Sequence, residues 1–303
     1  MKPLKIFQKK PILSVVVVFH NMRREAKRTL FTLCSGYQEG VLGSEYEVIA
    51  VDSNSQDPLD KKMVLSFGTQ FRYYQVVSKH PSPCRAMNEG VDKSQGDYVM
   101  CLIDGARMLS PGIIRKSLQA LKEFDNPFIY TLGMHLGSKV QNESILDGYN
   151  QSVEDEMLNH TPWINNGYRL FSISSVALSS KDGFYSELTE SNCFSLHKES
   201  YFLLGGLDEE FITPGGGLVN LDFFKRATLR DEMTPVMLLG EATFHQYHGG
   251  VATNVPMKDH PWPDFAAEYL RIRGKGYEPH FRRPVYFGEI VEEASHLVLP
   301  GKS

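Results

Sequence analysis

Apolar and polar residues alternate along the first 125 residues in a way that predicts strands separated by helices. Strands are expected at 12–19, 46–51, 71–77 and 98–103. The first of these is a near-continuous β-branched run, which is typical of a strand buried on both faces. Helices are expected between them at 23–38, after Asp57-Pro58 with Asp57 as the cap, and after Ser110-Pro111. This order predicts parallel βαβ units with right-handed crossovers.

The pattern after residue 125 is less regular but still mixes strands and helices. Further strands are expected at 128–136, 171–178, 194–196 and 236–239. Further helices are expected at 147–160, 198–204 and 218–229. Glycine clusters at 215–217 and 249–250 mark flexible or tightly turned loops. The whole pattern predicts an α/β fold with a mixed, mostly parallel central sheet flanked by helices.

Composition and charge restrict the partners and the compartment. The 303 residues are 42% hydrophobic and 22% charged, as in ordinary globular proteins. A net charge of -4 gives no overall attraction to nucleic acid or anionic lipid, so phosphate must be bound locally. No apolar stretch is long enough to span a membrane, and the four cysteines lack metal-type spacing and favour a reduced compartment. We therefore expect a cytoplasmic protein, which could attach to a membrane through partners.

Two aspartates stand at the ends of expected strands. Asp52 begins the polar turn Asp52-Ser53-Asn54-Ser55, and Asp104 follows the strand at 98–103. Ligands of open parallel sheets bind beyond the carboxyl ends of the strands, so both carboxylates are expected at one crevice. One acid would suit a base or ribose, and the other a metal held against a diphosphate. Each aspartate alone could instead cap the helix after its strand.

The chain resembles family-2-type, GT-A fold glycosyltransferases, which are inverting enzymes that use nucleotide-diphosphate sugars. The resemblance covers roughly residues 12–230. It rests on five segments in the order of the family's motifs, Ser14 to Asn21, Val51 to Asp57, Arg85 to Gly90, Gly96 to Asp104 and Gly205 to Phe211.

The resemblance implies roles for the matching positions. Asp52 would accept a hydrogen bond from the base, usually uracil, and Asn54 lies in the same turn. The backbone from Phe19 through His20 to Asn21 would line that pocket. Asp104 would meet the ribose or a divalent metal, while Arg85 and Asn88 would lie beside the nucleotide or diphosphate.

The chain departs from the family at two acidic positions. The Asp-x-Asp metal motif is Asp104-Gly105-Ala106 here, so one carboxylate is missing. The acidic pair expected before the late Asp-x-x-x-Arg falls on Val219-Asn220, and an amide cannot accept a proton at neutral pH. The catalytic base is therefore unassigned, with Glu190 and Asp222 as candidates. Asp222 most simply pairs with Arg226 on one helix.

Histidines and an arginine offer substitutes for the missing metal-site acid. His245 and His248 precede the turn at 249–250 and could bind Mn²⁺ or Mg²⁺ together with Asp104. They could equally be loop histidines bonded to backbone, or contact the diphosphate directly. Arg107 could neutralise the departing diphosphate without a metal, or form a surface ion pair.

The expected function is transfer of a sugar from a nucleotide diphosphate donor, a UDP-sugar first, to a hydroxyl of a sugar, glycan or other acceptor with inversion. The resemblance to the family also implies a role in polysaccharide biosynthesis. The alternative is a catalytically degenerate nucleotide-sugar-binding or scaffold protein. We expect one domain over 1–303, with a nucleotide-binding half at about 12–125, an acceptor and catalytic half at about 126–255 and a C-terminal helical extension at about 256–303. A homodimer is an open option.

Overall fold

The expected strands of the first hundred residues form the parallel part of one sheet. The computed structural model describes residues 10–298. The parallel strands are β1 (Leu13–Phe19), β2 (Tyr46–Ser53), β3 (Phe71–Val76) and β4 (Tyr98–Leu102). Val15 and Val17 of β1 lie in the apolar core on one face, and Val16 and Val18 lie in the core on the other. Burial of both faces explains why β1 is apolar at every position but Ser14.

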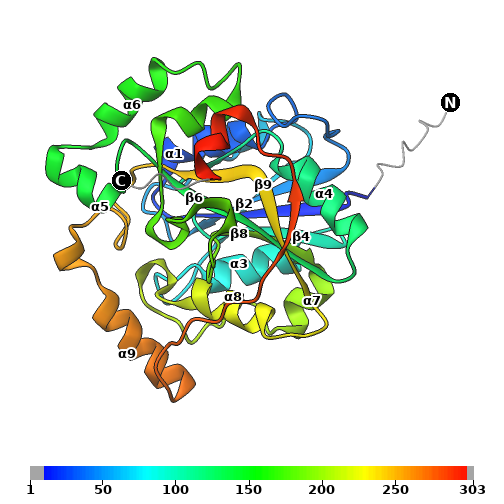
Figure 1. The fold of residues 1–303 in the computed structure, drawn as a ribbon, viewed down its shortest axis with the longest axis vertical. Helices are drawn as coiled ribbons and strands as arrows, with labels where there is room; N and C mark the ends of the chain where they lie inside the picture. Colours follow the sequence, from blue (N-terminus) through cyan, green and yellow to red (C-terminus); the bar gives the residue numbers. More distant parts are fainter. Residues whose placement is uncertain (1–9, 299–303) are drawn as a thin grey trace.

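Helices cover both faces of the sheet (Figure 1). One core contains residues of α1 (Arg23–Thr32), α2 (Lys61–Leu65) and α4 (Ile113–Glu123). The other contains residues of α3 (Cys84–Asp92), α6 (Gln151–Asn159), α7 (Lys198–Leu203), α8 (Val219–Thr228) and α9 (Trp262–Arg273). The short α5 (Gln141–Ser144) follows the strand β6.

The second half of the chain extends the same sheet with mixed strand directions. It adds β6 (Pro127–Leu136), β8 (Cys193–His197), β9 (Thr234–His245) and β10 (Val285–Gly288), in the order β10-β9-β6-β8-β4-β1-β2-β3. β8 runs antiparallel to its neighbours β4 and β6, whereas β9 is parallel to both β6 and β10. Two short strands, β5 (Arg107–Leu109) and β7 (Ser174–Val176), pair with β9 and β6. The predicted mixed, mostly parallel α/β fold is confirmed.

Several local predictions were wrong. Residues 171–178 contain only the three-residue β7, because Leu170 and Phe171 pack into the core from a 3₁₀ helix at Gly167–Ile173. The side chain of Asn166 caps that helix. Asp57 pairs with Arg23 instead of capping, and Asp60 caps α2 by accepting from Lys62 N.

The segment 256–303 is helical only in part. After α9 it returns to the sheet as β10, four residues that the sequence pattern did not mark. Within residues 10–298, no helix combines the length and the apolar character needed to cross a bilayer.

A buried ion pair fixes the end of the sheet where β10 joins. Lys116 of α4 and Glu241 of β9 are almost fully buried, and Lys116 Nζ lies 3.0 Å from Glu241 Oε1. The same ammonium donates to the carbonyls of Leu239 at 3.0 Å and Glu289 at 3.1 Å. Lys116 therefore ties α4 to β9 and to the residue after β10.

We expect Lys116→Met to lower the free energy of unfolding by about 3–5 kcal/mol, because it leaves the Glu241 carboxylate buried without its cation. Urea unfolding followed by circular dichroism measures this. The control Lys122→Met removes an exposed lysine of the same helix and should change the stability by less than about 0.5 kcal/mol. Equal stabilities of the two variants would contradict the role of the pair.

Candidate active site

The carboxyl ends of β1 and β4 and the end of β9 meet at one place. Asp104 leaves β4 two residues after Leu102, and the chain then turns into β5. β5 pairs antiparallel with β9 in a register that sets Arg107 opposite His245. Gly105 is required in the connecting turn, because a Cβ there would lie 2.3 Å from Phe19 Cδ1 and 2.6 Å from Val18 O. These contacts place the Asp104 carboxylate beside the end of β9.

Positive and dipolar groups surround the Asp104 carboxylate, whose side chain is only 20% exposed. Its Oδ2 lies 2.9 Å from His245 Nε2 and 3.6 Å from Arg107 Nε, and its Oδ1 lies 3.8 Å from His248 Nε2. The Ala106 amide donates to Oδ1 at 2.9 Å. Burial alone would raise the pKa of Asp104, but the two histidines and Arg107 together hold it well below its usual range. Asp104 is therefore ionised at neutral pH.

The tautomer of His245 is set by Gln141. The Gln141 side-chain amide donates to the His245 carbonyl at 2.9 Å, so its Oε1 faces His245 Nδ1 at 2.8 Å and also accepts from Asn254. His245 Nδ1 must then carry the proton that it donates to Oε1. Burial lowers the pKa of His245 to about 4, against the opposing effect of Asp104. Its Nε2 faces the Asp104 carboxylate.

Asp104, His245 and His248 thus form a set of donors that fits a metal ion. One ligand atom from each lies within 4.8 Å of the others, and His245 Nε2 is 3.2 Å from His248 Nε2. At 2.9 Å, His245 Nε2 and Asp104 Oδ2 repel each other unless a proton or a metal ion lies between them. The hydrogen bond from His245 Nδ1 to Gln141 is the kind of outer contact that orients metal-binding histidines. One carboxylate and two imidazoles suit a divalent ion of the first transition series, Mn²⁺ among them, and leave coordination positions for a ligand.

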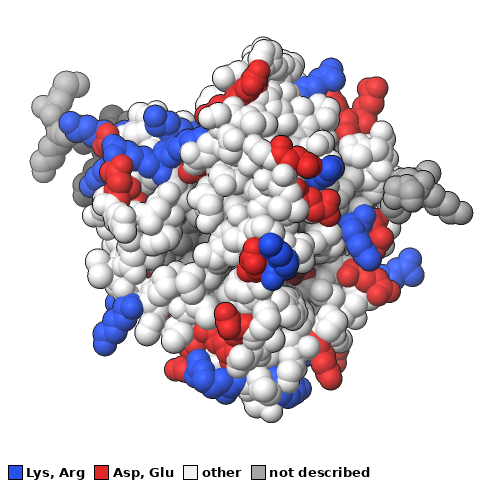
Figure 2. All heavy atoms as spheres, turned by 90° about the vertical axis from the view of Figure 1, so that its left-hand side faces the viewer, with Lys and Arg blue, Asp and Glu red and all other residues white. Residues whose placement is uncertain are grey.

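Asp104 and His248 line a cavity of about 710 Å³, and His245 is fully buried beside them. This volume lies in the size range of small-molecule sites. His20, Asn21 and Ser53 contribute from the carboxyl ends of β1 and β2. Further parts of the wall come from segments 177–180, 189–192, 214–221 and 248–253 and from the first turn of α9. The side of the molecule that carries α5, α6 and α9 is hollowed near its middle, and mostly uncharged side chains surround the hollow (Figure 2).

Arg107 is not a surface residue. It is 4% exposed and lines the cavity, and burial lowers its pKa against the opposing effect of Asp104. Its Nε is buried without a hydrogen-bond acceptor. Arg107 therefore places its positive charge next to the space where a ligand of Asp104 would lie.

Other predicted site residues are held by contacts within the protein. Asp52 is 2% exposed and accepts from Leu59 N at 2.8 Å, and Phe19 is fully buried in the core. Asn54 bonds to the backbone of Ser78 through both ends of its amide. None of the three lines the cavity.

Arg85 and Asn88 lie on α3, also outside the cavity lining. Arg85 pairs with Glu89 on the same helix. Asn88 donates to Leu207 O at 2.8 Å and accepts from Leu207 N at 3.0 Å, so it secures the glycine turn after α7.

The two candidates for the base differ in position. Asp222 is buried between Arg226, its expected partner on the helix, and Arg273, and does not line the cavity. Glu190 lines the cavity, and its Oε2 accepts a hydrogen bond from Asn220 Nδ2 at 3.1 Å.

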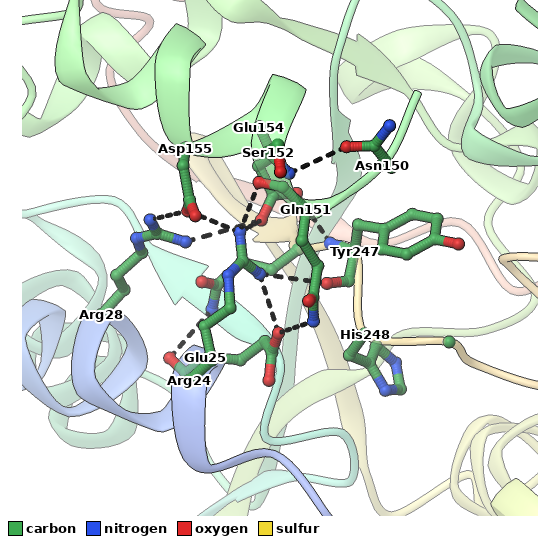
Figure 3. A network of polar contacts seen from close by, with 12 residues as sticks. Arg24, Glu25, Arg28, Asn150, Gln151, Ser152, Glu154, Asp155, Tyr247 and His248 are labelled. Carbon is green, nitrogen blue, oxygen red and sulfur yellow. Dashed lines mark hydrogen bonds and ion pairs between the residues drawn. The ribbon is translucent and has the colours of Figure 1, made fainter. Parts of the chain in front are cut away.

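A network of ion pairs and hydrogen bonds holds the residue before His248 in place (Figure 3). No sequence pattern indicated this network. Arg24 of α1 contacts Glu25, Glu154 and Asp155, the last two from α6. Glu154 Oε2 accepts from Tyr247 N at 2.7 Å, and Arg24 Nη1 donates to Tyr247 O at 3.2 Å. Both backbone groups of the residue before His248 are thereby fixed.

Comparisons with known proteins agree with this geometry. Residues 14–129 match the model described as Glycosyl transferase family 2. Among solved structures, TarS of S. aureus matches with a TM-score of 0.53 and 12% identity over 88% of this chain. TarS 1-349 in complex with UDP-GlcNAc matches with a TM-score of 0.52 and 13% identity over 85% of this chain. No curated protein matches the chain.

The chain spans 40% of the first of these TarS structures and 66% of the second. At this level of identity the likeness shows the fold alone. The family match and the fold together confirm the resemblance to family-2-type, GT-A fold glycosyltransferases.

The network around Tyr247 predicts a pH dependence. Burial raises the pKa of Glu154 to about 7, against the opposing effects of the Tyr247 amide and Arg24. In the unfolded chain its pKa is about 4.3. Between about pH 4.3 and pH 7, folding is therefore accompanied by uptake of a proton at Glu154. The contribution of the protonated group to stability is full below about pH 4 and is lost as the pH rises through about 7.

We therefore expect the stability of the protein relative to its Glu154→Gln variant to fall by about 1–3 kcal/mol between pH 5 and pH 8. Urea unfolding of both proteins at several pH values measures the difference. Glu156→Gln, an exposed position of the same helix, is the control and should show a flat difference. A flat difference for Glu154→Gln as well would show that its pKa is not raised.

Proposed function

We propose that the chain is an active glycosyltransferase that moves a sugar from a nucleotide diphosphate donor to an acceptor hydroxyl, with inversion at the anomeric carbon. The observation that carries the proposal is the convergence of Asp104, His245 and His248 beside Arg107 at the wall of the cavity, which Asp104, Arg107 and His248 line. It lies at the carboxyl ends of the strands, where ligands of α/β sheets bind. The family 2 match over residues 14–129 supports the reaction class.

The donor half of the site is proposed to lie within about 12–125, and the acceptor half within about 126–255. His20, Asn21 and Ser53 on the first side are polar groups suited to a nucleoside. The TarS structure that holds UDP-GlcNAc supports UDP as the first nucleotide to test. The acceptor would be a sugar or glycan of a polysaccharide pathway. We keep the segment 256–303 in the same domain because β10 pairs with β9.

Charge on the departing diphosphate is the main chemical demand of the reaction. A divalent ion, when bound, would supply Lewis-acid neutralisation of that charge. Asp104, His245 and His248 would hold it, and Gln141 keeps the His245 lone pair directed toward it. Arg107, paired with Asp104 and lining the cavity, adds a fixed positive charge at the same place.

Calorimetric titration with UDP, GDP, CDP and dTDP tests the proposal. We expect one nucleotide, UDP first, to bind with a Kd in the micromolar range when Mn²⁺ is present, and at least about tenfold more weakly with a chelator. Metal-independent binding would indicate that Arg107 and the histidines hold the diphosphate directly. If none of the four nucleotides binds, the protein is the scaffold suggested by the missing acids at Ala106 and Asn220.

The double variant His245→Ala/His248→Ala is expected to bind Mn²⁺ at least about tenfold more weakly, because it removes two of the three donors. Mn²⁺ binding followed by electron paramagnetic resonance measures this without turnover. His160→Ala, an exposed histidine at the end of α6, is the control. Unchanged Mn²⁺ affinity of the double variant would exclude the histidines as ligands.

A further inference from the structure

Two carboxylates line the cavity among residues 10–298, Asp104 and Glu190. Asp104 is surrounded by Arg107 and the two histidines, so we assign it to the part of the site that neutralises the diphosphate of the donor. Glu190 has no cationic partner within ion-pair distance, and its one hydrogen bond comes from the side-chain amide of Asn220. Its carboxylate is therefore available to accept a proton from a molecule bound in the cavity.

The other proton acceptors in the cavity wall are engaged. His20 donates from Nδ1 to Ser53 O, and its Nε2 faces the Asn21 amide. His135 and His260 each accept a backbone N–H at Nδ1, from Gln141 and Trp262, so in the neutral rings Nε2 carries the proton and cannot accept another. His248 Nε2 points at His245 and Asp104. Glu190 is the group that remains.

Glu190 is also held in place. The next residue, Ser191, is buried and donates from Oγ to Thr131 O at 3.1 Å and to Cys193 O at 2.7 Å. These contacts anchor the segment to β6 and to the start of β8. Asn220 fixes the carboxylate from the other side, at the beginning of α8. A base positioned by two fixed elements loses little entropy when it meets its substrate.

We propose that Glu190 is the catalytic base of the transfer, in place of the acid that Asn220 lacks. The assignment rests on the proposed function. Glu190 Oε takes the proton of the acceptor hydroxyl while the acceptor oxygen forms a bond to the anomeric carbon. The bond from that carbon to the β-phosphate oxygen breaks, and its electron pair leaves with the nucleoside diphosphate. Asn220 acts as a positioning residue through its hydrogen bond to the carboxylate.

Water can take the place of the acceptor, so hydrolysis of the donor provides the assay while the acceptor is unidentified. Release of UDP is measured with UDP-GlcNAc, UDP-glucose, UDP-galactose and UDP-GalNAc, and UDP affinity is measured by calorimetry. Glu190→Gln should lower kcat with the best donor by about 10²–10⁴-fold and leave the Kd for UDP unchanged. Glu187→Gln, an exposed neighbour, should match the wild type.

The double variant Glu190→Gln/Asn220→Asp places a carboxylate on the other side of the same hydrogen bond. We expect its kcat to be at least about tenfold higher than that of Glu190→Gln, because general-base assistance is restored. Recovery would separate a missing base from a disturbed fold.

Three outcomes would overturn the assignment. Activity of Glu190→Gln within threefold of the wild type would show that another group takes the proton. Loss of UDP binding in Glu190→Gln would make the residue a binding or structural group. If the wild type binds none of UDP, GDP, CDP and dTDP and releases UDP from none of the four donors, the proposed function fails, and the assignment of the base fails with it.

Discussion

The antiparallel pairing of β5 with β9 is the constraint on which the candidate site depends. It sets Arg107 opposite His245, and so brings the loop after β4 to the end of a strand more than 130 residues later in the chain. Without this register, Asp104 would stand alone at the end of β4. With it, the carboxylate meets one imidazole directly and a second from the following loop.

The same pairing explains why the second acid of the metal motif is absent. Ala106 is fully buried in the core that also contains residues of α1 and α4, and its carbonyl accepts from Gln246 N at 2.8 Å. A carboxylate at this position would be buried in apolar surroundings at a cost of several kcal/mol. His245 and His248 supply donors from the other side of the pocket. The site therefore keeps three side chains that could bind a metal. Two of them come from the end of β9 and the loop after it, and not from the Asp-x-Asp segment of the family pattern.

Sequence patterns predicted β1, β2 and β4 because their residues are almost all buried and mostly apolar, whereas β3 is a partly exposed strand at the edge of the sheet. They did not predict β5 or β10, and they overestimated the length of β7, because strands of three or four residues are too short to show a period. Asp104 and the two histidines could be proposed as partners from residue type alone. The contacts of Gln141 with His245 and of Glu154 with Tyr247 join residues about a hundred positions apart, and only the folded chain shows them. Asn88 and Asp52 lie in segments that match family motifs, but in the structure both side chains bond to backbone groups of nearby loops.

The chain order of the strands has a consequence for synthesis on the ribosome. β1 to β4 are neighbours in sequence and in the sheet, so this half can assemble while later residues are still being added. Its edge at β4 waits for β8, and the Asp104 loop waits for β9. A nascent chain would thus display an unpaired strand for about ninety rounds of elongation, from Leu102 to Cys193, and a solitary carboxylate until His245 has been added. Chaperone demand during translation would be set by that interval.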